Sequence, residues 1–174
     1  ELQKDVDRLQ TITERFSKIG SLPELKSENV EKNLEPILEY MKTRSPKKVE
    51  FSVLTSNSEI EAMINTPLFH WVIENLVRNA IDAMAGKGKI EFKTSENEQS
   101  VILDISDTGK GMSPQKKKDV FEPGFTTKKR GWGLGLTLTK RIIEDYHKGK
   151  IIVKQTKIDE GTTFRITLSK GTKL

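Results

Sequence analysis

Two asparagines stand one helical turn apart in a segment of helical apolar spacing between residues 67 and 85. Asn75 and Asn79 are four residues apart and Asp82 follows three residues later, so a helix places the three side chains on one face. An amide oxygen suits Mg²⁺, which is held in proteins by few side chains, by waters and by phosphate oxygens. Asparagine also costs helix propensity, so a pair without an evident packing gain favours a binding role over a structural one. We therefore predict that Asn79 is a metal ligand.

The charged neighbour of this pair has two interpretations. Glu74 could polarise an attacking group, or it could form an ion pair with Arg78 one turn further on. The sequence leaves both open.

A second polar site follows an expected strand at residues 101–106. Asp107 comes directly after this strand and is followed by Gly109 and Gly111, which let the backbone approach a ligand closely. An ionised carboxylate only accepts hydrogen bonds and therefore suits an exocyclic amine such as that of adenine. Alone, an aspartate before glycine is more often only a turn.

A glycine-rich segment precedes the last expected helix, at residues 134–147. Gly131, Gly133 and Gly135 put free backbone amides and a helix N-terminus where a polyphosphate could bind. The segment does not match the dinucleotide pattern, because position 136 is leucine and no strand precedes it. On its own it predicts only a flexible loop.

The order of the motifs carries more information than any one of them. The chain contains them at residues 74–83, 107–111, 121–128, 131–136 and 161–164. This order and spacing resemble the N, G1, F, G2 and G3 boxes of the ATP-binding domain of sensor histidine kinases, in the GHKL superfamily. The resemblance covers roughly the last three quarters of the chain.

The resemblance implies roles for individual residues. Asn79 would hold Mg²⁺, Asp107 would bind the adenine amine and Thr162 would join a water-mediated contact to the ring. The segment between residues 121 and 133 would be a mobile lid, in which Lys128 neutralises phosphate charge. Glu74 and Asn79 are the catalytic candidates. The expected ATP-binding set is Asn75, Asn79, Asp82, Asp107, Gly109, Gly111, Phe121, Phe125, Thr126, Thr127, Lys128, Gly131, Gly133, Leu134, Gly135, Leu136 and Thr162.

The same resemblance implies a reaction. ATPases of the gyrase and Hsp90 type carry a water-activating glutamate at the position of Asn75, and an amide cannot act as a base. Transfer of the γ-phosphoryl group to a histidine outside this chain, and thence to a response regulator receiver domain, is therefore expected. A hydrolysing ATPase and a non-catalytic adaptor remain the alternatives. His70 and His147 lack the acidic residue that follows phosphoacceptor histidines, so we predict a packing role for His70 and a dipole-favoured helix C-terminal position for His147.

The elements that must position these residues follow from the apolar spacing. Helices are expected at residues 27–43, with Pro36 either kinking or starting the helix, and at 67–85, 114–120 and 134–147. Strands are expected at residues 49–53, 60–64, 90–94, 101–106, 151–153 and 164–168, with a turn at 95–98 and a helix end at 86–88. The sum predicts an α/β sandwich (α+β), a mixed, mainly antiparallel sheet with helices on one face, which matches the Bergerat or GHKL fold.

The N-terminal region carries a short amphipathic helix. Its apolar stripe ends at Gly20, and the resemblance identifies residues 1–25 as the end of a dimerisation hairpin, with residues 26–174 as the catalytic domain. A helix packed on its own domain is the alternative. A homodimer of the full-length protein is expected. Because the chain starts at Glu1, we expect an excised fragment of a longer protein.

Composition narrows the class of protein. The chain has no cysteine, a net charge of +5 and no apolar run long enough to span a bilayer, so we expect a cytoplasmic domain without membrane contact. Its basic residues are dispersed and no aromatic-basic platform is present, which argues against nucleic-acid binding.

Overall fold

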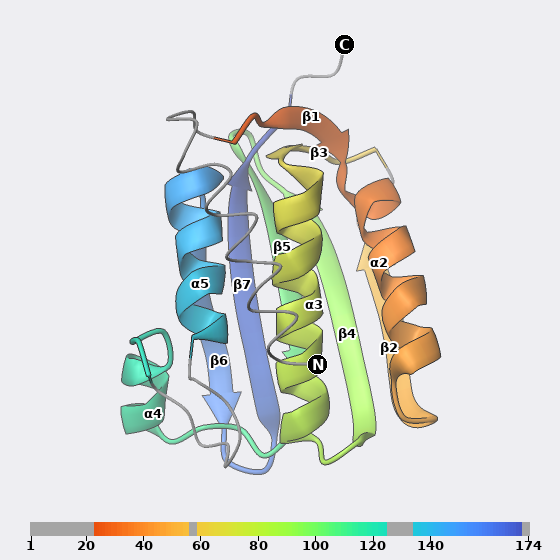
Figure 1. The fold of residues 1–174 in the computed structure, drawn as a ribbon, viewed down its shortest axis with the longest axis vertical. Coiled ribbons are helices and arrows are strands. Elements are labelled where there is room, and N and C mark those ends of the chain that lie inside the picture. Colours follow the sequence, from red (N-terminus) through yellow and green to blue (C-terminus); the bar gives the residue numbers. More distant parts are fainter. Residues whose placement is uncertain (1–22, 56–58, 125–133, 172–174) are drawn as a thin grey trace.

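The structure is a computed structural model that describes residues 23–55, 59–124 and 134–171 (Figure 1). The expected N-terminal helix and most of the expected lid lie outside these residues. In chain order the elements are β1 (Lys26–Asn29), α2 (Val30–Arg44), β2 (Lys48–Thr55), β3 (Glu61–Ile64), α3 (Thr66–Ala83), β4 (Lys87–Glu96), β5 (Ser100–Asp107), α4 (Pro114–Asp119), α5 (Gly135–Arg141), the π-helical segment η1 (Ile142–Tyr146), β6 (Lys150–Lys157) and β7 (Gly161–Ser169).

The described strands form a main sheet of five strands in the order β2-β4-β5-β7-β6. β2 and β4 are parallel and every other pair in this sheet is antiparallel. β1 and β3 form a separate two-stranded antiparallel sheet. The predicted mixed, mainly antiparallel sheet is confirmed.

Helices α2, α3 and α5 all lie on one face of the main sheet, with α3 across its middle strands (Figure 1). The core fills the space between these two layers. On β5, Val101, Leu103 and Ile105 are buried toward the helices, because alternate residues of a strand point to the same face. The predicted α/β sandwich with helices on one face is confirmed. No described helix has the length and hydropathy needed to cross a membrane.

The start of α2 differs from the sequence-based prediction. Helix was expected from residue 27, but Lys26–Asn29 form β1, and the helix begins at Val30 with the Asn29 side chain accepting from the Lys32 N–H. Pro36 lies inside the helix on its exposed side, so the idea that it starts the helix is wrong. Residues of the opposite side, from Val30 to Met41, pack into the core.

Helix α3 carries the asparagine pair and is fixed at both ends. Asn65 caps its N-terminus by accepting from the Leu68 N–H, and Pro67 occupies the first turn, where a missing N–H costs nothing. The helix ends at Met84, after which Ala85 and Gly86 adopt positive φ. Two smaller predictions are wrong here: Lys87 and Gly88 belong to β4 rather than to the helix end, and β4 extends through Glu96 into the expected turn.

The last helical region is not one regular helix. Residues 135–141 are α-helical, whereas residues 142–146 form a π-helical turn. His147 follows this turn and is fully buried; its Nδ1 donates to the Ile142 carbonyl at 2.9 Å and its Nε2 accepts the Asn65 N–H at 3.1 Å. Burial lowers the pKa of His147, and its bond to Ile142 opposes this only in part. His147 does lie at the C-terminal end of the helical region, as expected, but burial disfavours its charged form, so the expected stabilisation by the helix dipole is wrong.

Candidate functional site

The first part of the site is the contact between α3 and the start of α5. Asn75 Nδ2 donates to Thr139 Oγ1 at 2.9 Å, and Thr139 is fully buried. On the other side of the amide, a Cβ built on Gly135 would lie 2.6 Å from Asn75 Oδ1. Asn75 therefore holds the first turn of α5 against α3, and only glycine fits at position 135. Leu134 is exposed and Leu136 half-buried at this helix end.

The charged neighbour of Asn75 makes the predicted ion pair. Arg78 Nη2 donates to Glu74 Oε1 at 2.6 Å, across one turn of α3. Both side chains are partly exposed, so the pair contributes little to stability.

The second part of the site is the loop after β5. The Gly109 N–H donates to Asp107 Oδ1 at 2.8 Å, and the main chain of Thr162 also donates to this carboxylate. Burial raises the pKa of Asp107, and these two donors offset only part of the effect. Each carboxylate oxygen accepts more than one hydrogen bond, so acceptor capacity remains for an amine.

Two glycines make this loop possible. Gly161 has φ of 96°, and a Cβ there would lie 1.9 Å from the Asp107 carbonyl oxygen. Gly111 has φ of 64°, and its Cβ would lie 1.9 Å from the Lys157 carbonyl oxygen. We expected Gly111 to give room to a ligand; in the structure it gives room to the β6–β7 connection.

The loop is also tied to the C-terminal end of α3. The Lys110 N–H donates to the Ala83 carbonyl at 3.0 Å, and a Cβ on Gly109 would lie 2.7 Å from the Ala83 Cβ. Asn75 and Ala83 are eight residues apart, which is about 12 Å along a helix at 1.5 Å per residue. Asn79 is half-buried between these two contacts, and Asp82 is exposed beside the second. The two expected ligand-binding motifs therefore meet the same helix, with Asn79 between them.

Thr162 joins a hydroxyl network beside Asp107. Its side chain is buried, and its Oγ1 lies 2.9 Å from Thr156 Oγ1, which in turn accepts the Met112 N–H. The network links β6, β7 and the loop after β5. Sequence analysis missed Thr156, because a threonine in a strand is ordinary.

The segment expected to be a lid is anchored at its first residue. The Phe121 ring packs edge-to-face on Phe164, with centroids 6.1 Å apart, and Lys140 lies over it at 5.7 Å. Thr137 Oγ1 donates to the Phe121 carbonyl at 3.0 Å, which ties this point to α5. The other predicted lid residues lie outside the described part of the chain: Phe125, Thr126, Thr127, Lys128, Gly131 and Gly133.

Two residues of α5 were missed by sequence analysis. Thr139 fixes the Asn75 amide and Lys140 contacts Phe121. The only sequence signal for Thr139 was a hydroxyl one turn after Gly135 on the buried side of the helix. In the described residues, no group of three or more His, Asp or Glu side chains could hold a metal ion. A metal ion at this site would need further oxygen ligands from a bound molecule. Phosphate oxygens are such ligands, and they suit Mg²⁺.

Comparison with protein families gives one assignment for most of the chain. Residues 65–172 match the family described as histidine kinase-, DNA gyrase B-, and HSP90-like ATPase. This range begins at the N-cap of α3 and contains both parts of the site.

Comparison with individual proteins agrees. Sporulation kinase E of Bacillus subtilis is 41% identical over 98 residues, which are 56% of this chain and 13% of the kinase. The chain thus spans a small part of that relative. The nucleotide-free catalytic domain of the histidine kinase ThkA has a TM-score of 0.77 at 28% identity, covering 85% of this chain and 97% of that domain. ThkA in complex with the response regulator TrrA has a TM-score of 0.74 at 26% identity, covering 97% of this chain and 49% of that one.

Proposed function

Because the chain belongs to the histidine kinase-, DNA gyrase B- and HSP90-like ATPase family, we propose that it is the ATP-binding catalytic domain of a sensor histidine kinase. The observation that carries this proposal is the convergence on α3: the Asp107 loop contacts one end of the helix, the start of α5 contacts the other, and Asn79 lies between them.

The Asp107 end binds the adenine base. Its carboxylate accepts a hydrogen bond from the exocyclic amine. The carboxylate is buried and bonded to the main chain, so a base without that amine would leave one of its acceptor positions empty, which makes the contact selective. Gly109 lines the base, and Thr162 joins through a water.

The α5 end receives the phosphates. The amides of Gly135 and Leu136 lie in the first turn of α5, where no side chain caps them. Asn79 would hold Mg²⁺ through its amide oxygen, and the ion would neutralise phosphate charge there. The lid residues Lys128, Thr126 and Thr127, with Phe125, Gly131 and Gly133, complete this end. Glu74, which pairs with Arg78 in the structure, polarises the attacking group.

The acceptor is a histidine on a helix outside this chain. Its ring nitrogen takes the γ-phosphoryl group and ADP leaves; a response regulator aspartate then receives the phosphoryl group. Support comes from the two described histidines: His147 is fully buried, and His70 Nε2 lies 2.7 Å from the Asn33 carbonyl oxygen, so neither is placed to accept it. The complex of the similar ThkA with TrrA supports a response regulator as partner.

The amide side chain of Asn75 favours phosphoryl transfer over hydrolysis. Its amide donates to Thr139, packs close to Gly135 and is not basic, so no group at this position activates water.

Radiolabelled ATP tests the class of reaction. We expect the protein with [γ-³²P]ATP and Mg²⁺ to retain nucleotide on a filter, to carry no acid-labile phosphohistidine and to release phosphate no faster than buffer. Label on His70 or His147 would contradict the external acceptor. Rapid phosphate release would favour an ATPase.

A further inference from the structure

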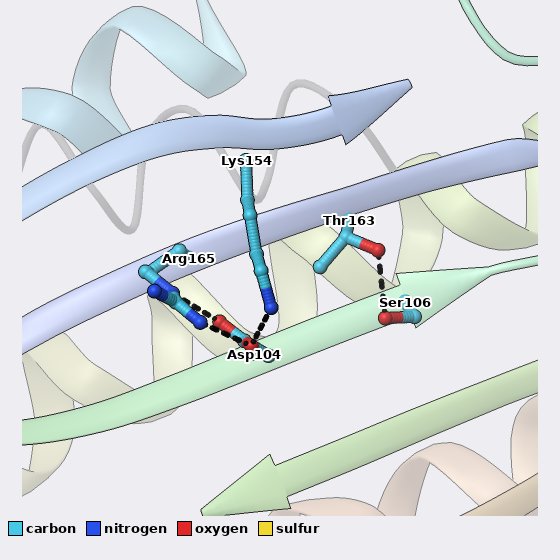
Figure 2. Close-up of polar contacts among 5 residues, drawn as sticks. All are labelled: Asp104, Ser106, Lys154, Thr163 and Arg165. Atoms are coloured by element: carbon cyan, nitrogen blue, oxygen red, sulfur yellow. Dashed lines mark hydrogen bonds and ion pairs between the residues drawn. The ribbon is translucent and has the colours of Figure 1, made fainter. Parts of the chain in front are cut away.

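The face of the main sheet turned away from the helices carries an ordered set of charges. In Figure 2, Asp104, Lys154 and Arg165 meet on this face, with the helices behind the strands. Arg165 Nε and Nη2 donate to the two oxygens of Asp104 at 2.7 and 2.8 Å, and Lys154 Nζ donates at 2.8 Å. The Asp104 side chain is only 8% exposed although no described helix covers it, because the two basic side chains lie over it.

Lys154 reaches Asp104 from two strands away. The register between β6 and β7 shifts between Val153 and Gln155, which leaves Lys154 out of the ladder at a bulge. Bulges commonly redirect a side chain, and here it crosses β7 to reach β5 (Figure 2). Burial alone would raise the pKa of Asp104, but the bonds and charges of Arg165 and Lys154 outweigh burial and lower it. The carboxylate thus stays ionised and holds both cations in place.

This cluster is the centre of a row that crosses all five strands. Cross-strand partners continue from Asp104 to Lys93 and Leu54 on one side, and to Arg165 and Ile152 on the other. We call these five residues the central row. Four strand spacings of about 4.8 Å make it roughly 19 Å long. Its two ends are exposed aliphatic side chains, Leu54 at 48% and Ile152 at 39%.

Positive charge dominates the rest of this face. Glu91, in the neighbouring row, pairs with Lys89 at 3.1 Å. Within the described residues, neither Lys93 nor Lys150 has an ion-pair partner, and the central cluster keeps one net positive charge. The face therefore offers two cations that are held by Asp104 and two lysines without an ion-pair partner among the described residues, together with an aliphatic side chain at each end of the central row.

We propose that the central row is a docking surface for an acidic protein segment, one that presents carboxylates around aliphatic side chains. A guanidinium already held in one geometry loses little entropy when it binds a second carboxylate. Arginine is enriched in protein interfaces and among the residues that contribute most to binding. The small width of the row suits a weak, salt-sensitive contact rather than a permanent one.

A lipid surface fits this row less well than a protein. The aliphatic ends lie on edge strands about 19 Å apart and do not form one insertable patch.

The test is an amide-shift titration of the ¹⁵N-labelled protein with a 15-residue peptide in which glutamates surround two leucines. We expect shifts confined to the segments of β2, β4, β5, β7 and β6 that carry the central row, lost at 300 mM salt and absent with a glutamine-substituted peptide. Lys93→Gln and Ile152→Ser should each weaken binding at least about fivefold, whereas their controls, Lys117→Gln on α4 and Ile158→Ser, should stay within about twofold.

Several results would overturn the proposal. These are shifts spread evenly over the lysines of α2 and α4, equal loss in the control variants, or equal binding of the glutamine peptide. Binding of phosphatidylglycerol vesicles that depends on Lys93, without binding of the acidic peptide, would assign the row to a membrane instead. Both test side chains are exposed, and dispersed amide spectra of the variants show whether each is folded.

Discussion

Gly161 illustrates how single residues build the site. It faces the Asp107 carbonyl across β5 and β7 with a positive φ, so backbone occupies the space that a side chain would need. The carboxylate that we assign to the adenine base is presented by this close approach. The hydroxyl network of Thr156 and Thr162 then fixes the strand beside it.

Gly161→Ala should destabilise the protein. The new Cβ would lie 1.9 Å from the Asp107 carbonyl oxygen at φ of 96°, so the backbone must move, and we expect a loss of about 2 kcal/mol or more in the free energy of unfolding. Gly124→Ala is the control, because Gly124 also has positive φ, 77°, but a Cβ there would meet no atom of the described residues within 4 Å apart from its own chain neighbours. It should cost only about 1 kcal/mol. Equal urea midpoints for the two variants would contradict this account.

His147 should make stability depend on pH. Its pKa is lowered in the folded protein, so below its unfolded value of about 6.5 the unfolded chain binds more protons and gains stability. The free energy of unfolding should therefore fall as pH drops from 7 to 5.5, by up to about 1.4 kcal/mol per pH unit. Protonation of Nε2 would also leave the Asn65 N–H without its acceptor.

Urea unfolding at a series of pH values checks this dependence. The His147→Gln variant should lose the slope between pH 7 and 5.5, although it is less stable throughout. His70→Gln should keep the slope, because no comparable burial surrounds that side chain. A slope unchanged in His147→Gln would show that another group titrates.

At the scale of the elements, the site depends on how α3 meets α5. The Asn75 amide bonds to Thr139 on one side and leaves room only for glycine on the other. Since α5 begins at Gly135, this one contact sets the position of the amides that we assign to the phosphates.

Thr139→Val should loosen this contact. Valine keeps the shape but removes the acceptor, and the half-buried Asn75 amide left without its partner costs about 1 kcal/mol, the lower end of the range for buried groups. Thr139→Ser, which keeps the hydroxyl, should lose less. Hydrogen exchange of the α5 amides should be faster in the valine variant than in the serine variant. Equal exchange in the two would mean that packing alone holds α5.

The elements also show what the sequence could predict. α3 and strands β4 to β7 have clear apolar periods, and their predicted positions agree with the structure to within a few residues. β1 has no such period; its extended form comes from pairing with β3, Lys26 opposite Ile64. The π-helical turn at 142–146 keeps the buried spacing of a helix and so leaves no sequence signal.

The candidate site, like the fold, could be predicted from the sequence only in part. Motif order predicted Asp107, Gly109 and Asn79 as members of one ATP-binding set, and in the structure the loop after Asp107 contacts the C-terminal end of the helix that carries Asn79. It did not predict that Asn75 bonds to Thr139, because the partner is 64 residues away and threonine is common in helices. The proposed ligand roles of these residues remain predictions.

At the scale of the whole molecule, the two faces of the main sheet have different roles. The helix-covered face holds the core and the candidate nucleotide site, whereas the opposite face carries the central row. The site lies at the Asp107 end of β5 and the row crosses the middle of the same strand, so a nucleotide and an acidic partner could bind together. We therefore expect substitutions in the central row to leave nucleotide affinity unchanged.

The proposed ATP site depends on Asp107 as the adenine contact and on Asn79 as the magnesium ligand. Calorimetric titration with a non-hydrolysable ATP analogue tests both roles directly. The parent protein should bind it more tightly with Mg²⁺ than without. Asp107→Ala should weaken binding by roughly a hundredfold, whereas Asp119→Ala, at a half-buried carboxylate of α4, should not. Asn79→Ala should bind equally with and without Mg²⁺. No binding by the parent, or full affinity in Asp107→Ala, would contradict the account.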